Sequence, residues 1–263
     1  MHKIYLLFAF VLLLCIGCQW RLGNGDKESE WLFSISRYDR VECLYLTTGD
    51  VSALQQMNTE FPQQTRTLIE DVLHLGRVND PLINNRFYRF YQDSTLQMVL
   101  AETQRQYADM SDVNQQLSDA FENLLKLLPE VCVPEVYTQV GAFDQSIIVA
   151  NDMLGISLDK YLGADYPLYR KFGYSPEQLQ TMQRKYIVPD CMSFYLLYLF
   201  PPATDHEPTQ QERDAHIGRI QWMVNKVVRQ NFFHSPEVMK TDNFMKKHPQ
   251  VSAAELMKNP VKF

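Results

Sequence analysis

The N-terminus places the strongest constraint on this chain, because a short apolar run there is followed closely by a cysteine. Residues 4–14 form an unbroken run of eleven apolar side chains, and His2 and Lys3 precede it. A helix needs about 20 apolar residues to span the hydrocarbon core of a membrane, so this run is too short for a span. Its length is typical of the apolar part of a secretory signal peptide. We therefore expect an exported protein whose folded part begins after this segment.

The sequence Cys15-Ile16-Gly17-Cys18 follows the apolar run directly. It resembles the lipobox of bacterial lipoproteins, in which the second cysteine receives diacylglycerol and the signal peptide is then removed. Cys15 stands where a lipobox usually carries an aliphatic residue. We predict a signal peptide over residues 1–17 and a lipidated Cys18. Secretion without lipidation and an uncleaved N-terminal anchor helix are the alternatives.

The residues after Cys18 indicate how the folded part is attached and where it lies. Residues 18–30 are mostly polar and contain two glycines, which predicts a flexible tether ahead of a single globular domain over residues 31–263. Each buried CH₂ of an acyl chain contributes about 0.8 kcal/mol, so several chains on one cysteine anchor a protein stably. Gln19 in place of aspartate resembles the pattern that many Gram-negative bacteria sort to the outer membrane. We expect a periplasm-facing lipoprotein of a Gram-negative envelope, held at the outer membrane.

Composition excludes several other classes of protein. The chain has 25 Lys and Arg against 31 Asp and Glu, a net charge of −6, which argues against nucleic acid as a partner. Only Cys43, Cys132 and Cys191 remain after the predicted processing and lipidation, and one disulfide or three free thiols are both open.

Local signals predict a chain that is rich in helices. Residues 191–200 are apolar all round, which indicates a buried core helix of half the length that a membrane span requires. Residues 203–214 are expected to form a polar loop, and residues 215–229 an amphipathic helix. Capping residues and prolines predict further helix starts near Pro62, Ser94, Ser111, Pro176 and Pro236.

A few short strands complete the predicted architecture. Residues 31–36 alternate well enough for a strand, and residues 147–150 are a buried-strand candidate. Asp39 is expected to cap a helix over residues 40–46. The fold class that follows is α+β, predominantly helical with a few short strands.

The chain lacks the common motifs of catalysis. It contains no His-Glu-x-x-His motif for zinc, no Gly-x-Ser-x-Gly nucleophile elbow and no glycine-rich phosphate loop. Glu212 and His216 are four residues apart, but one such pair lacks a third zinc ligand and a base. We therefore expect no catalytic residues, no metal and no cofactor.

The most unusual stretch of the chain is residues 155–174. It combines five aromatic residues with three glycines, so it cannot form one regular helix. We expect the end of a strand, a short helix and an irregular loop. Such a segment either forms a binding surface or lines the core with its tyrosine hydroxyls bonded internally, and both interpretations stay open.

Three sequence blocks carry a resemblance to a known family. They are Ser-Arg-Tyr-Asp at residues 36–39, Pro-Glu-Val-Tyr at 134–137, and Leu-Asp-Lys-Tyr-Leu-Gly at 158–163 with Pro-Leu-Tyr at 167–169. Together they resemble the gliding-motility lipoprotein GldB family over about residues 33–200. The chain departs from the family pattern beyond Pro201.

The resemblance implies an envelope lipoprotein associated with gliding machinery and its linked secretion system, without an established enzymatic activity. It also implies a layout like that of zincin-type metallopeptidases whose metal motif has decayed. The family-like blocks single out a polar structural or binding cluster, which consists of Arg37, Asp39, Asp159, Tyr161, Gly163 and Tyr169.

We predict a non-catalytic membrane-anchored lipoprotein that contacts other envelope proteins, in a gliding cell or in a related role in a non-gliding one. One alternative is a divergent zinc-dependent hydrolase that uses His216. Another is a lipoprotein that binds a small molecule or glycan around residues 155–174.

Overall fold

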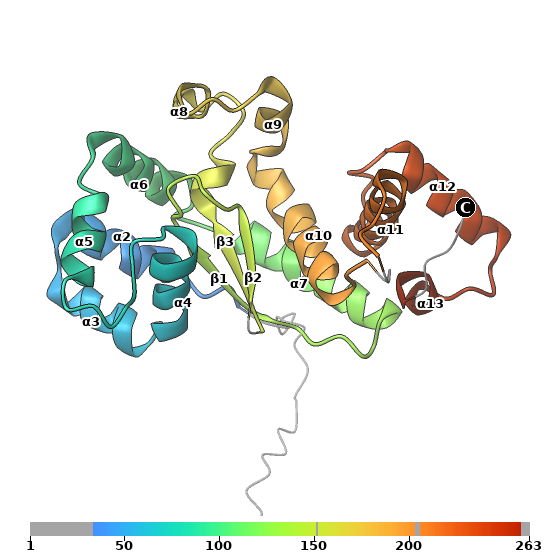
Figure 1. Ribbon diagram of the computed structural model, residues 1–263, viewed down its shortest axis with the longest axis horizontal. Coiled ribbons are helices and arrows are strands. Elements are labelled where there is room, and N and C mark those ends of the chain that lie inside the picture. The colour runs from blue at the N-terminus through green and yellow to red at the C-terminus, as the bar shows by residue number, and fades with distance from the viewer. Residues whose placement is uncertain (1–33, 151, 203–205, 259–263) are drawn as a thin grey trace, which may run out of the picture. The chain divides into compact units, whose positions relative to one another are not determined.

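A computed structural model describes residues 34–150, 152–202 and 206–258 (Figure 1). They all belong to one unit, Trp31–Phe263. The predicted signal peptide, Cys18 and the tether lie outside the described residues. Among the residues that are described, no helix has both the length and the apolar character needed to cross a membrane.

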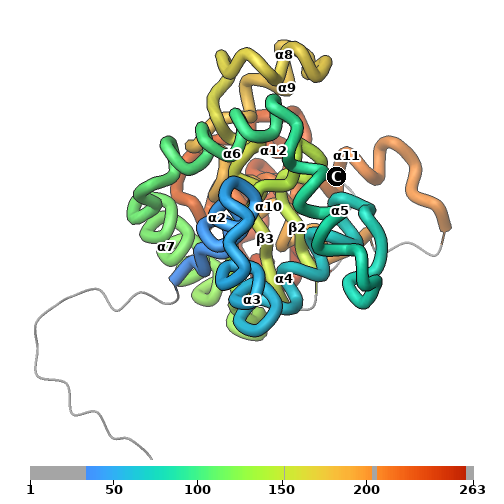
Figure 2. The backbone as a smooth tube through the Cα atoms, turned by 90° about the vertical axis from the view of Figure 1, so that its left-hand side faces the viewer, coloured from blue at the N-terminus to red at the C-terminus, as the bar shows by residue number. Residues whose placement is uncertain are grey.

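The first half of the described chain is helical. Its helices are α2 (Tyr38–Thr48), α3 (Val51–Thr59), α4 (Pro62–Arg66), a π-helix (Thr67–Val72), α5 (Ile83–Phe90), α6 (Ser94–Gln106) and α7 (Ser111–Leu127). The predicted starts at Pro62, Ser94 and Ser111 are confirmed. The side chain of Asp93 caps α6 by accepting hydrogen bonds from two main-chain N–H groups. Figure 2 views the molecule from the side of these helices.

The prediction that Asp39 caps a helix is wrong. Arg37 occupies the N-cap position of α2, and Asp39 lies inside the first turn with its side chain buried. The Asp39 carboxylate instead accepts hydrogen bonds from the Arg37 guanidinium and the Thr138 hydroxyl, so it does not bind the free N–H groups of the first turn. The predicted strand over residues 31–36 is reduced, in the described residues, to a single parallel bridge between Ser36 and Tyr137.

Three strands form the sheet, namely β1 (Glu135–Gln139), β2 (Ile147–Ala150) and β3 (Met153–Ser157). Their order is β1-β3-β2, with β3 parallel to β1 and antiparallel to β2. The predicted strand at 147–150 is therefore confirmed. Helix α2 packs against β1, and the later helix α10 (Ile187–Leu199) packs against β2 and β3 (Figure 1).

The aromatic-rich residues 155–174 have the mixed structure that the sequence predicts. The end of β3 leads into a 3-10 helix (Leu158–Tyr161), and an irregular loop then leads to the short helix α8 (Pro167–Lys171). Helix α9 (Pro176–Thr181) and a 3-10 helix (Arg184–Tyr186) connect this segment to α10. An antiparallel bridge between Leu162 and Gln183 joins the two ends of the segment that contains α8 and α9.

The C-terminal helices are α11 (Gln210–Val228), α12 (Pro236–Lys247) and α13 (Ala253–Lys258). The predicted loop over residues 203–214 is too long, because α11 already begins at Gln210. Thr209 and Glu212 form a reciprocal capping box there. The polar side chains that suggested a loop are therefore the ones that begin the helix.

Tyrosines are prominent among the largest side chains in the interior of the described chain. Six of its largest fully buried side chains are tyrosines, among them Tyr91 and Tyr107. Cys43 and Cys191 are buried free thiols, Cys132 is an exposed one, and no disulfide joins them. Burial raises the pKa of the Cys43 and Cys191 thiols well above its ordinary value, so both are inert at neutral pH. The fold is α+β and predominantly helical, as predicted, and a zincin-like layout stays a prediction.

Candidate functional site

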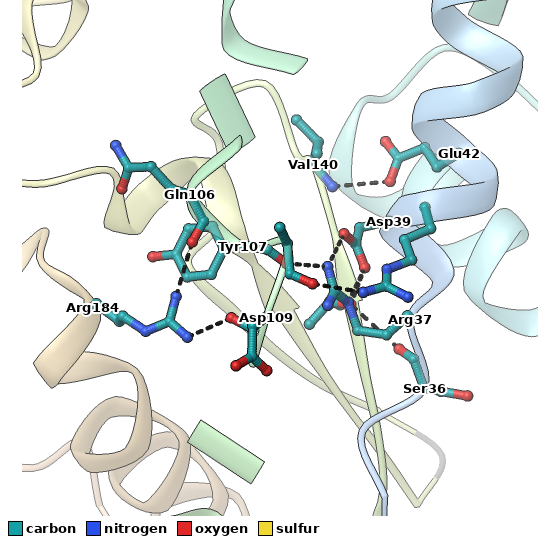
Figure 3. Close-up of polar contacts among 12 residues, drawn as sticks. Ser36, Arg37, Asp39, Glu42, Gln106, Tyr107, Asp109, Val140 and Arg184 are labelled. Atoms are coloured by element: carbon teal, nitrogen blue, oxygen red, sulfur yellow. Dashed lines mark hydrogen bonds and ion pairs between the residues drawn. The ribbon is translucent and has the colours of Figure 1, made fainter. Parts of the chain in front are cut away.

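Arg37 and Asp39 form a two-pronged ion pair at the start of α2 (Figure 3). Nε and Nη2 of Arg37 donate to the two carboxylate oxygens of Asp39, each at 2.8 Å. The Thr138 hydroxyl also donates to Asp39, whose side chain is only 1% exposed. A buried carboxylate needs such donors, and here they tie the first turn of α2 to β1.

Tyr107, at the end of α6, links this ion pair to the aromatic-rich segment. Arg37 Nη2 donates to the Tyr107 carbonyl at 2.7 Å, and the Tyr107 hydroxyl donates to the Tyr161 carbonyl at 2.6 Å. The Arg184 guanidinium lies 4.9 Å from the centre of the Tyr107 ring and donates to the Asp109 carbonyl (Figure 3). Tyr107 is therefore a site residue that the sequence did not reveal.

Two buried carboxylates hold the turn that follows β1. Glu42 accepts a hydrogen bond from the Val140 N–H at 2.9 Å, whereas its other oxygen has no partner among the described residues. Asp159 accepts from the N–H groups of Gly141 at 2.8 Å and Phe143 at 2.5 Å. Phe143 has a φ of 67°, a left-handed conformation that turns its N–H toward the carboxylate.

Burial dominates the electrostatics of both carboxyl groups. It raises the pKa of Glu42 well above its ordinary value, with the Val140 bond acting in the opposite direction. Burial likewise raises the pKa of Asp159, although the N–H groups of Gly141 and Phe143 favour its charged form.

The other predicted site residues surround Asp159. The Tyr169 hydroxyl donates to the Asp159 carbonyl at 2.5 Å and accepts from the Leu162 N–H at 2.8 Å. Gly163 has a φ of 109° and donates to the Met182 carbonyl at 3.0 Å. Tyr169 therefore fits the interpretation that residues 155–174 line the core, because its hydroxyl forms hydrogen bonds within the fold.

The six predicted cluster residues thus fall into two groups. Arg37 and Asp39 lie where α2 meets β1, whereas the other four belong to the segment that follows β3. Tyr107 joins the two groups by binding both Arg37 and Tyr161.

A small polar pocket adjoins the second group. The Tyr161 hydroxyl donates to Asp190 Oδ2 at 2.8 Å, and burial raises the pKa of Asp190 to about 7. Lys160 donates to the Tyr174 hydroxyl at 2.8 Å and to the Phe143 carbonyl at 3.1 Å. The pocket has a volume of about 170 Å³ and is lined by Ser146, Lys160, Tyr161, Tyr174, Gln178, Thr181, Met182 and Asp190.

We place the candidate site at this pocket, which we call the Asp190 pocket, because it combines a cavity with a half-buried acid whose pKa is raised toward neutrality. A larger pocket of about 380 Å³ lies between α7 and the end of α11. Its charged residues include Glu122 and Lys126, which pair with each other and are both 59% exposed. Sequence reasoning missed Asp190 because it lies at the start of an otherwise apolar helix.

The Asp190 carboxyl makes the stability of the fold depend on pH. Its pKa is raised from 3.8 to about 7, so the native state binds more protons than the unfolded state between these values. Its contribution to stability therefore falls as pH rises from about 4 to about 7 and is constant above that. Asp190→Asn cannot ionise and still offers Tyr161 an acceptor.

We expect Asp190→Asn to raise the free energy of unfolding at pH 8 relative to the unmodified chain, with a smaller gain at pH 5. The upper limit is about 1.4 kcal/mol for each unit of pKa shift. Urea denaturation at both pH values measures the difference, and exposed Asp165→Asn is the matched control. An equal effect of Asp190→Asn at pH 5 and pH 8 would contradict this assignment.

The structure does not gather zinc ligands around His216. Within residues 34–258, leaving out the undescribed 151 and 203–205, no group of three His, Cys, Asp or Glu side chains could hold a metal ion. His216 is buried beside Arg219, with 3.4 Å between its Nδ1 and Nη2 of the arginine. Burial and this neighbouring cation lower the pKa of His216. Cys18 lies outside the described residues.

The fold and this site define a predominantly helical α+β domain in which buried polar side chains tie the helices to a small sheet. A family model described as "Gliding motility protein GldB" matches residues 26–231, which is more than half of the chain. The chain belongs to this GldB lipoprotein family, as the resemblance predicts. No curated protein and no solved structure matches it.

Proposed function

We propose that this chain is a non-catalytic lipoprotein that is anchored to an envelope membrane and acts through protein–protein contacts. The observation that carries the proposal is the GldB family match over residues 26–231, since this is a family of lipoproteins. Membership supports a membrane-anchored envelope protein associated with gliding motility. A related envelope role in a cell that does not glide is the alternative proposal; the family match itself continues past Pro201 to residue 231.

The geometry of the polar cluster supports the non-catalytic part of the proposal. Both oxygens of Asp39 accept hydrogen bonds from Arg37, and both oxygens of Asp159 accept bonds from the main chain. A general acid or base must reach a substrate, whereas these carboxylates bind donors of their own chain. Their role in the proposal is to hold the fold together.

Anchoring follows from the N-terminal sequence. We propose that residues 1–17 are removed as a signal peptide, that Cys18 carries the lipid and that residues 18–30 tether a single globular domain over 31–263. The domain then faces the periplasm from the outer membrane of a Gram-negative cell.

Replacement of Cys18 by alanine tests the anchor. Without the thiol no diacylglycerol can be attached, so we expect Cys18→Ala to move the protein from the membrane fraction to the soluble fraction or to leave an unprocessed precursor. Cell fractionation with immunoblotting measures this, and exposed Cys132→Ala is the matched control. Mature Cys18→Ala protein that stays in the membrane fraction would refute a lipid anchor.

Crosslinking followed by affinity purification from native envelopes tests the protein contacts. We expect a defined envelope protein to copurify with the crosslinked chain and not with a soluble Cys18→Ala form. Stoichiometric zinc in the purified protein would instead support the alternative of a zinc-dependent hydrolase.

A further inference from the structure

Helix α8 lies at the end of the sheet opposite to the point where the N-terminal segment joins the domain. Ser36 forms a parallel bridge with Tyr137, so the residues before Ser36 run toward the start of β1. Because β1 and β3 are parallel, the same end of the sheet holds the start of β3, whereas α8 follows the other end. Two perpendicular views show α8 beyond this other end of the strands (Figure 1, Figure 2). A chain that enters at Ser36 therefore joins the domain on the side away from α8.

Three consecutive exposed residues at the end of α8 form what we call the α8 tip, namely Arg170, Lys171 and Phe172. The Phe172 side chain is 52% exposed. Neither cation forms an ion pair or a side-chain hydrogen bond with a described residue. Lys171 influences Asp93 electrostatically, but the Asp93 carboxylate accepts its hydrogen bonds at the start of α6. The tip therefore presents an aromatic ring and two positive charges to solvent.

A buried aromatic cluster supports the ring of Phe172. Its centre lies 5.1 Å from the ring centre of Phe143, which is itself buried. Phe143 packs edge-on against Tyr169, with ring centres 5.4 Å apart. The Tyr174 hydroxyl donates to the Phe143 carbonyl at 2.7 Å and so fixes the chain that follows the tip. Because a supported aromatic side chain loses little conformational entropy on binding, Phe172 is suited to anchor a partner.

The charge of the tip selects the chemistry of that partner. The chain carries a net charge of −6, yet the two adjacent cations of the tip have no ion-pair partner among the described residues. Carboxylates complement guanidinium and ammonium groups, and an exposed aromatic anchor needs an apolar contact beside them. Complementary charges of this kind determine the specificity and the association rate of an interface. The tip therefore fits an acidic segment that also offers an apolar contact.

The orientation of α8 favours a protein over a membrane as the source of these carboxylates or other anions. An anionic membrane also attracts exposed cations and aromatic rings. In the proposed function, however, the anchor joins the domain on the side of Ser36, which is opposite to α8. The tip then points away from the membrane that holds the anchor.

We propose that the α8 tip binds an acidic segment of an envelope protein, with Phe172 as the apolar anchor and Arg170 and Lys171 paired with carboxylates. This inference rests on the proposed function as a protein-contact lipoprotein, and it names the surface and the chemistry of the contact. Residues 155–174 then combine the two interpretations of their sequence. Tyr169 lines the core, and the end of α8 forms the binding surface.

Site-specific photo-crosslinking in native envelopes tests this inference with the full chain. The photoreactive amino acid p-benzoylphenylalanine takes the place of Phe172. In separate control proteins it takes the place of exposed Val51 in α3 or exposed Met239 in α12. We expect a protein to be crosslinked from position 172 and not from either control position. Mass spectrometry of the crosslinked peptide should show Asp or Glu residues next to the attachment point.

Charge reversal tests the contribution of the two cations. Arg170→Glu combined with Lys171→Glu should lower the crosslinking yield from position 172 by about fivefold or more. Arg170→Lys combined with Lys171→Arg keeps both charges and should retain the yield. Lys247→Glu reverses an exposed charge outside the tip and should leave the yield unchanged. Circular dichroism verifies that each variant is folded.

Several results would overturn the proposal. A crosslink from position 172 to lipid would show a tip that faces the membrane. The absence of a crosslinked protein from position 172, equal crosslinking from all three positions, or a yield that charge reversal leaves unchanged would also overturn it. A protein crosslinked only from the control positions would refute the tip and leave protein contacts as such intact. Fractionation of Cys18→Ala tests the anchor separately.

Discussion

Asp159→Ala should destabilise the fold by about 2–5 kcal/mol. The substitution leaves the N–H groups of Gly141 and Phe143 without the oxygens that they now bind. Each buried donor without a partner costs about 1–3 kcal/mol. The backbone contact between Asp159 and Tyr169 survives, so the loss reports on the carboxylate itself.

Urea denaturation followed by circular dichroism measures this effect. Asp159→Asn keeps one oxygen as an acceptor and should fall between the unmodified chain and Asp159→Ala. Asp165→Ala changes an exposed aspartate of the same segment and should alter the free energy of unfolding by less than about 0.5 kcal/mol. A loss for Asp159→Ala that is no larger than that of this control would show that the carboxylate does not hold the turn.

Gly155→Ala should destabilise the fold by about 1–3 kcal/mol through overpacking. A β-carbon on Gly155 would lie 2.6 Å from both Cζ and Oη of Tyr137. The Tyr137 side chain is buried and its ring packs edge-on against Tyr38, with ring centres 6.3 Å apart, so it cannot swing away freely. The close approach of a strand to a ring is thus the reason for a glycine in the middle of β3.

A double-mutant cycle separates this clash from a general loss of strand stability. Tyr137→Leu shortens the side chain that meets the new β-carbon, so Gly155→Ala should cost less in the Tyr137→Leu background. Thermal unfolding of the four proteins gives the coupling energy. Strictly additive effects would locate the penalty elsewhere than at the Tyr137 ring.

Elements whose signals are local could be predicted from the sequence. Proline at the first helical position with a serine before it marks α9 and α12, and Asp93 marks α6. These capping contacts join residues within about four positions of each other, so both partners can be recognised in the local sequence. The start of α11 was missed because its capping box lies within a polar stretch that also suits a loop.

The candidate site could be predicted only in part. The family-like blocks identified Asp159 and Tyr161, yet they gave no indication of what these side chains bind. Glu42 meets the Val140 N–H across 98 residues, and Asp190 meets Tyr161 across 29. Such partners are brought together by the packing of α2 and α10 on the sheet, which no local pattern encodes.

The bridge that Ser36 makes at the edge of β1 has a consequence for the order of assembly. The Ser36 N–H donates to the Val136 carbonyl at 2.8 Å, and the Thr138 N–H donates to the Ser36 carbonyl at 3.0 Å. These contacts close a loop of about 100 residues, and long-range closures of this kind slow folding. If the chain crosses a membrane N-terminus first, Ser36 emerges about 100 residues before its partners Val136 and Thr138. Helix α2, which packs against β1, can therefore reach its final position only after residues 135–139 have followed it.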